Sequence, residues 1–339
     1  MSSQQRSTGP APVDASVEGF GTVLGAAVET AQHAPSIHNT QPWRWTFDGR
    51  VLLLHTEPAR QLAIADPAGR MLTLSCGAAL HHARVAIAAQ GHRPVITRFP
   101  DRTDPGLLAT LGVGDPLPAH GTATRLYGAL MRRRTDRRPV DERPPDPQAL
   151  DEVTAAVETE GVHAQLLRRD QVVELASAAA IARDVDSRDM LRRRELDDWV
   201  GRDRPDAAGI PEAAIPTVPG QETVSPRFPL AGQTGTLGTD PTGRDTAAAY
   251  LLLFCDTDEP ADWLRGGEAL SHAWAVATEN DLAVLPLSSV VEVAEARLEL
   301  YRALSGIGHP LIVLRLGVAG PGPTDAPRTE RIRREPHTG

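Results

Sequence analysis

The sequence predicts an α+β protein in which two related halves are fused in one chain. Amphipathic helical patterns alternate with short apolar strand-like runs, and Asp48-Gly49 is a hairpin signal between two of them. An internal repeat indicates the halves: residues 77–83 (Gly-Ala-Ala-Leu-His-His-Ala) match residues 267–273 (Gly-Glu-Ala-Leu-Ser-His-Ala) at an offset of 190. Each stretch lies in a helical pattern that precedes an apolar run. We therefore expect one plan used twice, with a ligand site between the halves.

The composition is typical of a folded globular chain. Its 339 residues are 41% hydrophobic and 23% charged, which allows two domains or one large one. The formal charge of −9 argues against nucleic acid as a main partner. An apolar run long enough to span a membrane is absent, and residues 1–12 lack a hydrophobic signal core, so we expect a cytoplasmic protein. Cys76 and Cys255 lie in apolar stretches and are interpreted as small buried residues.

The first half is expected over residues 17–125, after a disordered tail at residues 1–16 that is rich in Ser, Gln and Pro. Its expected elements are a helix capped by Asp14 or Ser16 and ending near residue 33, strands 43–47 and 51–55, a helix over 71–90 ended by Gly91, a strand over 94–99 and a short helix over 104–111.

The second half is expected over residues 126–325, before a basic tail at residues 326–339. Its expected elements are a helix that starts at Asp146-Pro147 and ends near residue 160, a strand over 162–167, a helix from Asp170 to about Trp199, a strand over 250–255, a helix over 266–280, an apolar run over 282–287, a helix over 293–304 and a strand over 310–316. Residues 201–245 are rich in proline and glycine and show neither a helical nor a strand-like hydrophobic periodicity. A segment of this length without periodicity predicts a lid or disorder.

The most distinctive stretch is residues 34–43, Ala-Pro-Ser-Ile-His-Asn-Thr-Gln-Pro-Trp. Pro35 and Pro42 prevent it from continuing a helix or entering a central strand, so it should form a stiff turn. Ser36, Asn39 and Gln41 can each donate and accept hydrogen bonds, as recognition of a flat heteroaromatic ligand requires. The alternative is a helix-ending turn whose side chains bond their own backbone.

A second candidate is the densest basic cluster of the chain, which contains Arg132, Arg133, Arg134, Thr135, Arg137 and Arg138. Arginine recognises phosphate with two parallel hydrogen bonds, and a threonine adds a hydroxyl. In an acidic chain such a cluster favours a pocket for one small anion, and the alternative is a solvated helix end. Arg328, Arg331, Arg333 and Arg334 form another basic group that either converges on the same anion or belongs to the tail.

Signatures of other chemistries are missing. The sequence has no dinucleotide-binding glycine motif after a strand, no Walker motif and no nucleophile elbow. His81 and His82 are adjacent and point to different helix faces, so we predict no metal pair there. The turn Pro286-Leu287-Ser288-Ser289 follows an apolar run; it can present backbone groups to a ring or simply end a strand.

Together these segments resemble the nitroreductase superfamily, and within it the Acg-like FMN-binding proteins of actinobacteria. Residues 34–43 are similar to the Pro-Ser-x-x-Asn-x-Gln-Pro-Trp motif, and residues 133–137 to the Arg-Arg-Ser-x-Arg motif, with Thr135 in place of serine. Residues 282–317 are similar to the closing helix and strand. The resemblance covers about residues 17–334 and implies a nitroreductase-like fold in which one chain is a fused, degenerate dimer with one complete flavin site.

The resemblance also implies roles for individual residues. Arg133 and Thr135, with Arg134 in the same motif, would hold the FMN phosphate and ribityl chain, and Arg137 would approach the N1/O2 side of the ring. The ring contacts would come from Pro35, Ser36, Asn39 and Gln41, with Pro286, Leu287 and Ser288 on the N5 side. Arg331 and Arg333 would close on the phosphate. Residues 201–245 lie where Acg-like proteins carry a lid over the flavin.

The function implied is an FMN-binding oxidoreductase that uses NAD(P)H to reduce a nitroaromatic or quinone-type acceptor. Because a covered flavin cannot stack a nicotinamide on its ring, the alternative is a flavin-sequestering or storage protein with little reductase activity. A third possibility is a paralogue without cofactor, retained for protein interactions. The internal pseudo-dimer favours a monomer.

Overall fold

The computed structural model describes residues 17–118, 121–201, 204–217, 222–224, 227–228, 237, 245–320, 327, 329–332 and 337–338. The expected tail at residues 1–16, with the cap assigned to Asp14 or Ser16, lies outside the described residues. Most of residues 218–244 and the side chains of Arg328, Arg333 and Arg334 also lie outside them.

The first half begins with α1 (Val17–Gln32), which leads through the short helix η1 (Ile37–Asn39) into the hairpin of β1 (Trp43–Phe47) and β2 (Leu52–Thr56). α2 (Arg70–Ala89) follows, then β3 (His92–Arg98) and β4 (Leu107–Pro116). These strands form an antiparallel sheet in the order β3-β4-β2-β1. The short β9 (His337–Thr338), from the far end of the chain, adds to β1 in parallel.

The second half repeats this plan. α4 (Pro147–Glu158) leads into β5 (His163–Leu166) and β6 (Ala249–Cys255), and α7 (Pro260–Glu279) leads into β7 (Leu282–Leu287) and β8 (His309–Val318). Their antiparallel sheet has the order β5-β6-β8-β7, the same path as β1-β2-β4-β3. The predicted α+β class is thus confirmed, and the two sheets share one topology.

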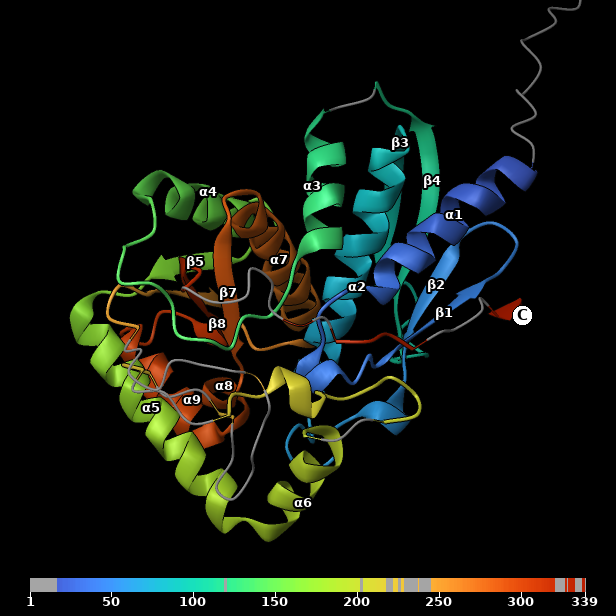
Figure 1. Cartoon of the computed structure of the whole chain (residues 1–339). Helices are drawn as coiled ribbons and strands as arrows, with labels where there is room; N and C mark the ends of the chain where they lie inside the picture. Colours follow the sequence, from blue (N-terminus) through green and yellow to red (C-terminus); the bar gives the residue numbers. More distant parts are fainter. Residues whose placement is uncertain are drawn as a thin grey trace, which may run out of the picture.

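Further helices are inserted into the second half. α5 (Arg169–Arg188), α6 (Met190–Trp199) and η3 (Glu212–Ala214) lie between β5 and β6, and α8 (Ser289–Glu292) and α9 (Ala294–Ala303) lie between β7 and β8. α5 packs against α8 and α9 below the second sheet (Figure 1). These insertions explain why the second half is longer than the first.

α2 and α7 lie side by side at the centre and make the most extensive helix pair (Figure 1). The repeated glycines are where they cross: a Cβ on Gly77 would strike the backbone of Leu264, and a Cβ on Gly267 would strike the backbone of Leu74. Gly77 and Gly267 are 190 positions apart, and so are Leu74 and Leu264, as in the sequence repeat. The glycines are therefore required by the close approach of two equivalent helices.

α3 (Gly121–Arg132) connects the two halves and packs against both α2 and α7. After α3 the chain runs beside β7, where the Asp136 amide donates to the Val284 carbonyl at 3.0 Å and Thr135 forms a parallel bridge with Val284. The basic cluster at residues 132–138 therefore lies beside β7.

Two expected elements were wrong. Residues 104–111 were expected to form a helix, but residues 107–116 form β4, because they pair with both β2 and β3 and bury Leu108, Ala109 and Leu111. The expected helix from Asp170 to Trp199 is divided at Asp189, whose backbone is extended and whose carboxylate accepts from the amides of Leu191 and Arg192. An internal N-cap thus starts α6.

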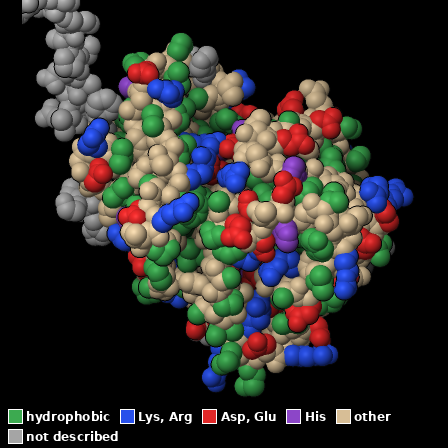
Figure 2. All heavy atoms as spheres, turned by 180° about the vertical axis from the view of Figure 1, so that it is seen from behind, with side chains coloured by type: hydrophobic (Ala, Val, Ile, Leu, Met, Phe, Trp, Pro, Cys, Tyr) green, Lys and Arg blue, Asp and Glu red, His purple; other side chains and the backbone are tan. Residues whose placement is uncertain are grey.

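Other local predictions were confirmed. The Asp146 carboxylate accepts from the Gln148 amide at 3.0 Å and caps α4, and Gly91 follows α2 with a positive φ. Both cysteines are buried. Acidic and basic side chains are interspersed over the face seen in Figure 2. Within the described part of the chain, no helix combines the length and the apolar character needed to cross a membrane.

Candidate functional site

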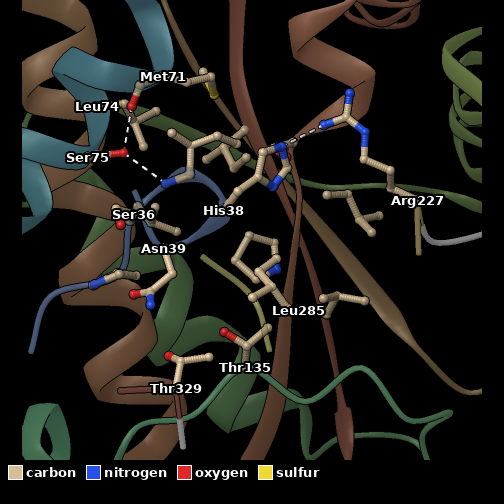
Figure 3. Close-up of a pocket in the computed structure, with 18 of the residues that line it drawn as sticks. Ser36, His38, Asn39, Met71, Leu74, Ser75, Thr135, Arg227, Leu285 and Thr329 are labelled. Atoms are coloured by element: carbon tan, nitrogen blue, oxygen red, sulfur yellow. Dashed lines mark hydrogen bonds between the residues drawn. The ribbon is translucent and has the colours of Figure 1, made fainter. Parts of the chain in front are cut away.

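A pocket of about 1010 Å³, measured out to its open mouth, lies between the two halves. η1 and α2 of the first half line it together with α7 and the end of β7 of the second half, and Figure 3 shows Ser75 of α2 beside η1. Segments after α3, from residues 201–245 and from the C-terminal region complete its walls. Segments that are distant in sequence therefore meet at one place.

The structure brings ten of the thirteen predicted site residues into the lining of this pocket. They are Pro35, Ser36, Asn39, Arg133, Thr135, Arg137, Pro286, Leu287, Ser288 and Arg331. Arg134 lines an adjoining pocket that shares Arg133, Thr135 and Arg137 with the first. Gln41 lines neither, and Arg333 is outside the described residues.

The turn at η1 is held in an unusual backbone conformation. His38, Asn39 and Gln41 have φ values of 43°, 56° and 51°, in the left-handed region that residues with a side chain seldom adopt. Side-chain hydroxyls hold it there: the Ile37 amide donates to Ser75 Oγ at 3.0 Å, and the Gln41 amide donates to Ser36 Oγ at 2.9 Å. The predicted stiff turn is present, anchored to α2 through Ser75 (Figure 3).

Asn39 joins three segments at the rim of the pocket. Its Nδ2 donates to the Gly209 carbonyl at 3.0 Å and to the Glu330 carbonyl at 3.1 Å, and its Oδ1 accepts from Arg331 at 2.9 Å. Gln41 acts in the same way, because its Oε1 accepts from the Ile332 amide at 3.0 Å. The amides of the turn thus hold the lid segment and the C-terminal segment in place.

The pocket has a basic end. Arg133 and Arg331 both donate to the His33 carbonyl, at 2.6 and 3.3 Å, and the Arg133 guanidinium lies 4.7 Å from the centre of the Trp274 ring. Among the described residues that line the pocket there is no aspartate or glutamate. Thr135 and Thr329 also line the pocket (Figure 3). Arginines and hydroxyls without carboxylates form a binding surface for an anion.

Arg137 adds a half-buried positive charge. Its side chain donates weakly to the Ala214 carbonyl, at 3.4 Å, and within the described residues it makes no ion pair with a carboxylate. Its neighbour Asp136 is bound by Arg138 in two-point contact. Burial lowers the pKa of Arg137 to about 10, against the opposing influence of Asp136. A partly desolvated cation that pairs with no carboxylate favours a ligand that brings negative charge.

Comparison with known proteins identifies relatives of the whole chain. No family model matches it. The Mycobacterium tuberculosis protein named "Putative NAD(P)H nitroreductase Rv3131" is 36% identical over 311 residues, which cover 91% of this chain and 88% of the relative. The M. tuberculosis protein named "Putative NAD(P)H nitroreductase acg" is 32% identical over 314 residues, covering 91% and 93%. The chain belongs to the Acg-like nitroreductase family.

Weaker matches were also found. The M. tuberculosis protein Rv3127, named as uncharacterized, is 30% identical over 336 residues that cover 94% of this chain and 95% of that protein. Among solved structures, NfrA2 of B. megaterium aligns with 60% of this chain and 70% of its own at 11% identity and a TM-score of 0.35. The family assignment rests on the full-length relatives.

The described part of residues 201–245, the segment expected to form a lid, contributes to the wall of the pocket. Ile210 and Phe228 line the pocket and pack with Val200, Ala214 and Ile215 in a small apolar cluster of their own. Sequence patterns could not identify these two residues, because residues 201–245 show no hydrophobic periodicity.

Arg227 anchors this lid to the protein. It donates to both oxygens of Glu292 in α8, at 2.8 and 2.7 Å, and to Asp186 in α5 at 2.8 Å. It also lies 3.1 Å from Nε2 of His38, which must accept because a guanidinium only donates (Figure 3). His38 is therefore neutral, with its proton on Nδ1. The lid is fixed by a buried charge network that reaches the pocket.

This network predicts acid sensitivity. Burial lowers the pKa of His38 to about 3; burial alone would raise the pKa of Glu292, but Arg227 and His38 lower it to about 2. The unfolded chain therefore binds more protons than the native one, by His38 below about pH 6.5 and by Glu292 below about pH 4.5. The contribution of these two groups to the free energy of unfolding is complete above these pH values and decreases as the pH falls.

We expect the free energy of unfolding to decrease on acidification from pH 6.5 to 5.0 by about 2 kcal/mol more in the wild type than in His38→Asn. Asparagine tolerates the left-handed backbone and does not titrate. Urea unfolding of both proteins at the two pH values measures the difference. Equal losses in the two proteins would show that His38 does not titrate as this account requires.

Proposed function

We propose that the pocket binds FMN and that the protein is an NAD(P)H-dependent nitroreductase-like oxidoreductase, acting on nitroaromatic or quinone-type acceptors. The observation that carries the proposal is the convergence, in one pocket, of hydroxyls from the first half and arginines from the second. The family of the chain supports it, because two full-length relatives are named as NAD(P)H nitroreductases. When bound, FMN would accept a hydride from NAD(P)H and pass its electrons to the acceptor.

The residues present fit this cofactor. Arg133, Arg134 and Thr135 would hold the phosphate and the ribityl chain, with Arg331 closing on the phosphate; Arg333 stays a candidate for the same role. Arg137 supplies a half-buried cation that suits the N1/O2 side of the ring, where negative charge develops on reduction. Pro35 and Ser36 would contact the ring from the first half. Pro286, Leu287 and Ser288 would line the N5 side.

The remaining walls would exclude water from the ring. Met71, Leu74, Leu270 and Trp274 belong to α2 and α7, and Leu285 and Ile312 belong to the second sheet. An apolar wall on one side and fixed donors at the edges are the arrangement that orients a flat cofactor. For Asn39 and Gln41 we propose an indirect role, since their amides bind the lid and C-terminal segments that cover the site.

We further propose that residues 17–125 and 126–325 correspond to the two subunits of a dimeric nitroreductase. The α2/α7 contact is then the former dimer interface enclosed in one chain, with the turn motif retained in one half and the arginine motif in the other. Such a chain has no need of a second copy to complete its site, which favours a monomer.

A specific observation favours a second candidate, a flavin-sequestering protein with little reductase activity. The lid places Ile210 and Phe228 in the pocket, and Arg227 ties it to the body through two buried carboxylates. A nicotinamide could stack on the ring only if this lid moved. Anaerobic addition of NADPH or NADH to the FMN-loaded protein separates the two: rapid bleaching of the flavin absorbance supports the reductase, and a stable oxidised spectrum supports sequestration.

We expect Arg227→Met to release FMN at least roughly tenfold faster than the wild type, because breaking a buried ion pair costs on the order of 3 kcal/mol. The rate is measured by mixing the FMN-loaded protein with excess apoflavodoxin-type acceptor or by dilution. Arg204→Gln is the matched control: it also removes a lid arginine, but Arg204 pairs with Asp206 and stacks on Trp199 near the surface. Equal release rates in all three proteins would contradict the proposed anchor.

A further inference from the structure

A cluster of two histidines and one glutamate lies outside the proposed flavin pocket, beside the two central helices. His81 of α2, His272 of α7 and Glu160, just after α4, each point a ligand atom at the same spot, and these atoms lie within 4.8 Å of one another. None of the three residues lines the pocket. We propose that they bind a Zn²⁺ ion that joins the two halves of the chain.

His81 is prepared to act as a ligand. Its Nδ1 lies 2.8 Å from Ser271 Oγ, and the ring is 1% exposed. With Nδ1–H donating to this hydroxyl, Nε2 keeps its lone pair for a metal, which is how the second nitrogen of a metal-binding histidine is usually fixed.

The two imidazole rings have the spacing that a shared metal imposes. Their centroids are 5.2 Å apart and their planes are inclined by 25°. Two imidazoles bound to one tetrahedral Zn²⁺, each at ~2.0–2.1 Å, place their centroids roughly 5 Å apart. Here the rings come from different helices, so the spacing is not a consequence of helical periodicity. The expectation from sequence concerned only His81 with His82, whose Nδ1 atoms both lie within hydrogen-bond distance of Ser271 Oγ.

Glu160 supplies the third ligand. Its Oε1 accepts from Arg84 and lies 2.9 Å from His272 Nδ1, and for Oε2 the structure gives no hydrogen bond within the described residues. The second oxygen, Oε2, is therefore available to an ion. Arg84 also pairs with Glu268, which Arg98 binds as well. His272 and Glu160 are 19% and 7% exposed, which gives an ion and a completing water molecule access.

The test is a zinc titration of the full chain after treatment with EDTA and gel filtration. Isothermal titration calorimetry should show one Zn²⁺ per chain, and the paired substitution His272→Gln with Glu160→Gln should weaken this binding on the order of 100-fold or more. The matched control is His163→Gln with Asp256→Asn, which removes an exposed histidine–carboxylate pair elsewhere and should leave the affinity unchanged.

A second measurement covers the case in which the paired variant fails to fold. Co²⁺ added to the wild type should give the visible bands of a four-coordinate site with nitrogen and oxygen ligands, and Zn²⁺ should remove them. The proposal is overturned if the wild type shows no stoichiometric binding, if the paired variant binds as tightly as the control, or if the Co²⁺ spectrum is that of the free hydrated ion.

Discussion

Gly267→Ala is expected to destabilise the folded protein by on the order of 3 kcal/mol, because the added methyl group has no space at the α2/α7 crossing. The obstacle is the backbone of Leu74 and Ala78 rather than a side chain that could rotate away. Relief therefore requires the two helices to separate, and both contribute walls of the pocket. Urea unfolding measures the loss, and a weaker affinity for FMN should accompany it.

The matched control for this substitution is Gly25→Ala in α1. A Cβ at Gly25 meets nothing within 4 Å, so the alanine should stabilise the helix by about 0.5–1 kcal/mol through its higher helical propensity. The two changes are chemically identical and differ only in the space around them. If Gly267→Ala were as well tolerated as Gly25→Ala, the close crossing of α2 and α7 would be wrong.

Replacing Arg133 and Arg137 together by glutamine should weaken FMN binding by roughly 10²–10⁴-fold, since hydrogen bonds to charged groups contribute about 1.5–3 kcal/mol each. Arg133 would lose its contact with the phosphate, and Arg137 its contact with the ring. The purified variant should be colourless where the wild type is yellow. Fluorescence titration with FMN gives the dissociation constants.

The control for the arginine pair is Arg93→Gln with Arg302→Gln, which changes the net charge equally. Both residues form exposed ion pairs, with Asp115 and Glu299, away from the pocket. Its affinity for FMN should match that of the wild type. Full occupancy of the Arg133/Arg137 variant by FMN would remove these arginines from the proposed site.

The sequence could predict those features that depend on local chemistry. The glycine repeat indicated two equivalent helices, and the structure shows these helices crossing at Gly77 and Gly267. The stiff turn at residues 34–43 followed from its prolines, and the basic segment from its composition. That the turn and the basic segment would share a pocket followed from the family resemblance, because no local pattern relates residues about 100 positions apart.

Features that depend on tertiary context could not be predicted. β4 is a strand because two neighbouring strands pair with it, which its own residues do not reveal. Asp189 interrupts a helical pattern by capping α6, although aspartate is common on solvated helices. Arg227 stands in a stretch without period, and its partners Asp186 and Glu292 were indistinguishable from surface carboxylates. His38 became informative only when its ring was found against Arg227.

The most direct test is a titration of the flavin-free wild type with FMN and with riboflavin, followed by flavin fluorescence. If one half supplies the turn and the other supplies the arginines, FMN binding saturates at one molecule per chain, and riboflavin, which lacks the phosphate, binds far more weakly. Saturation at two FMN per chain, equal affinity for the two flavins, or no saturable binding would contradict this account.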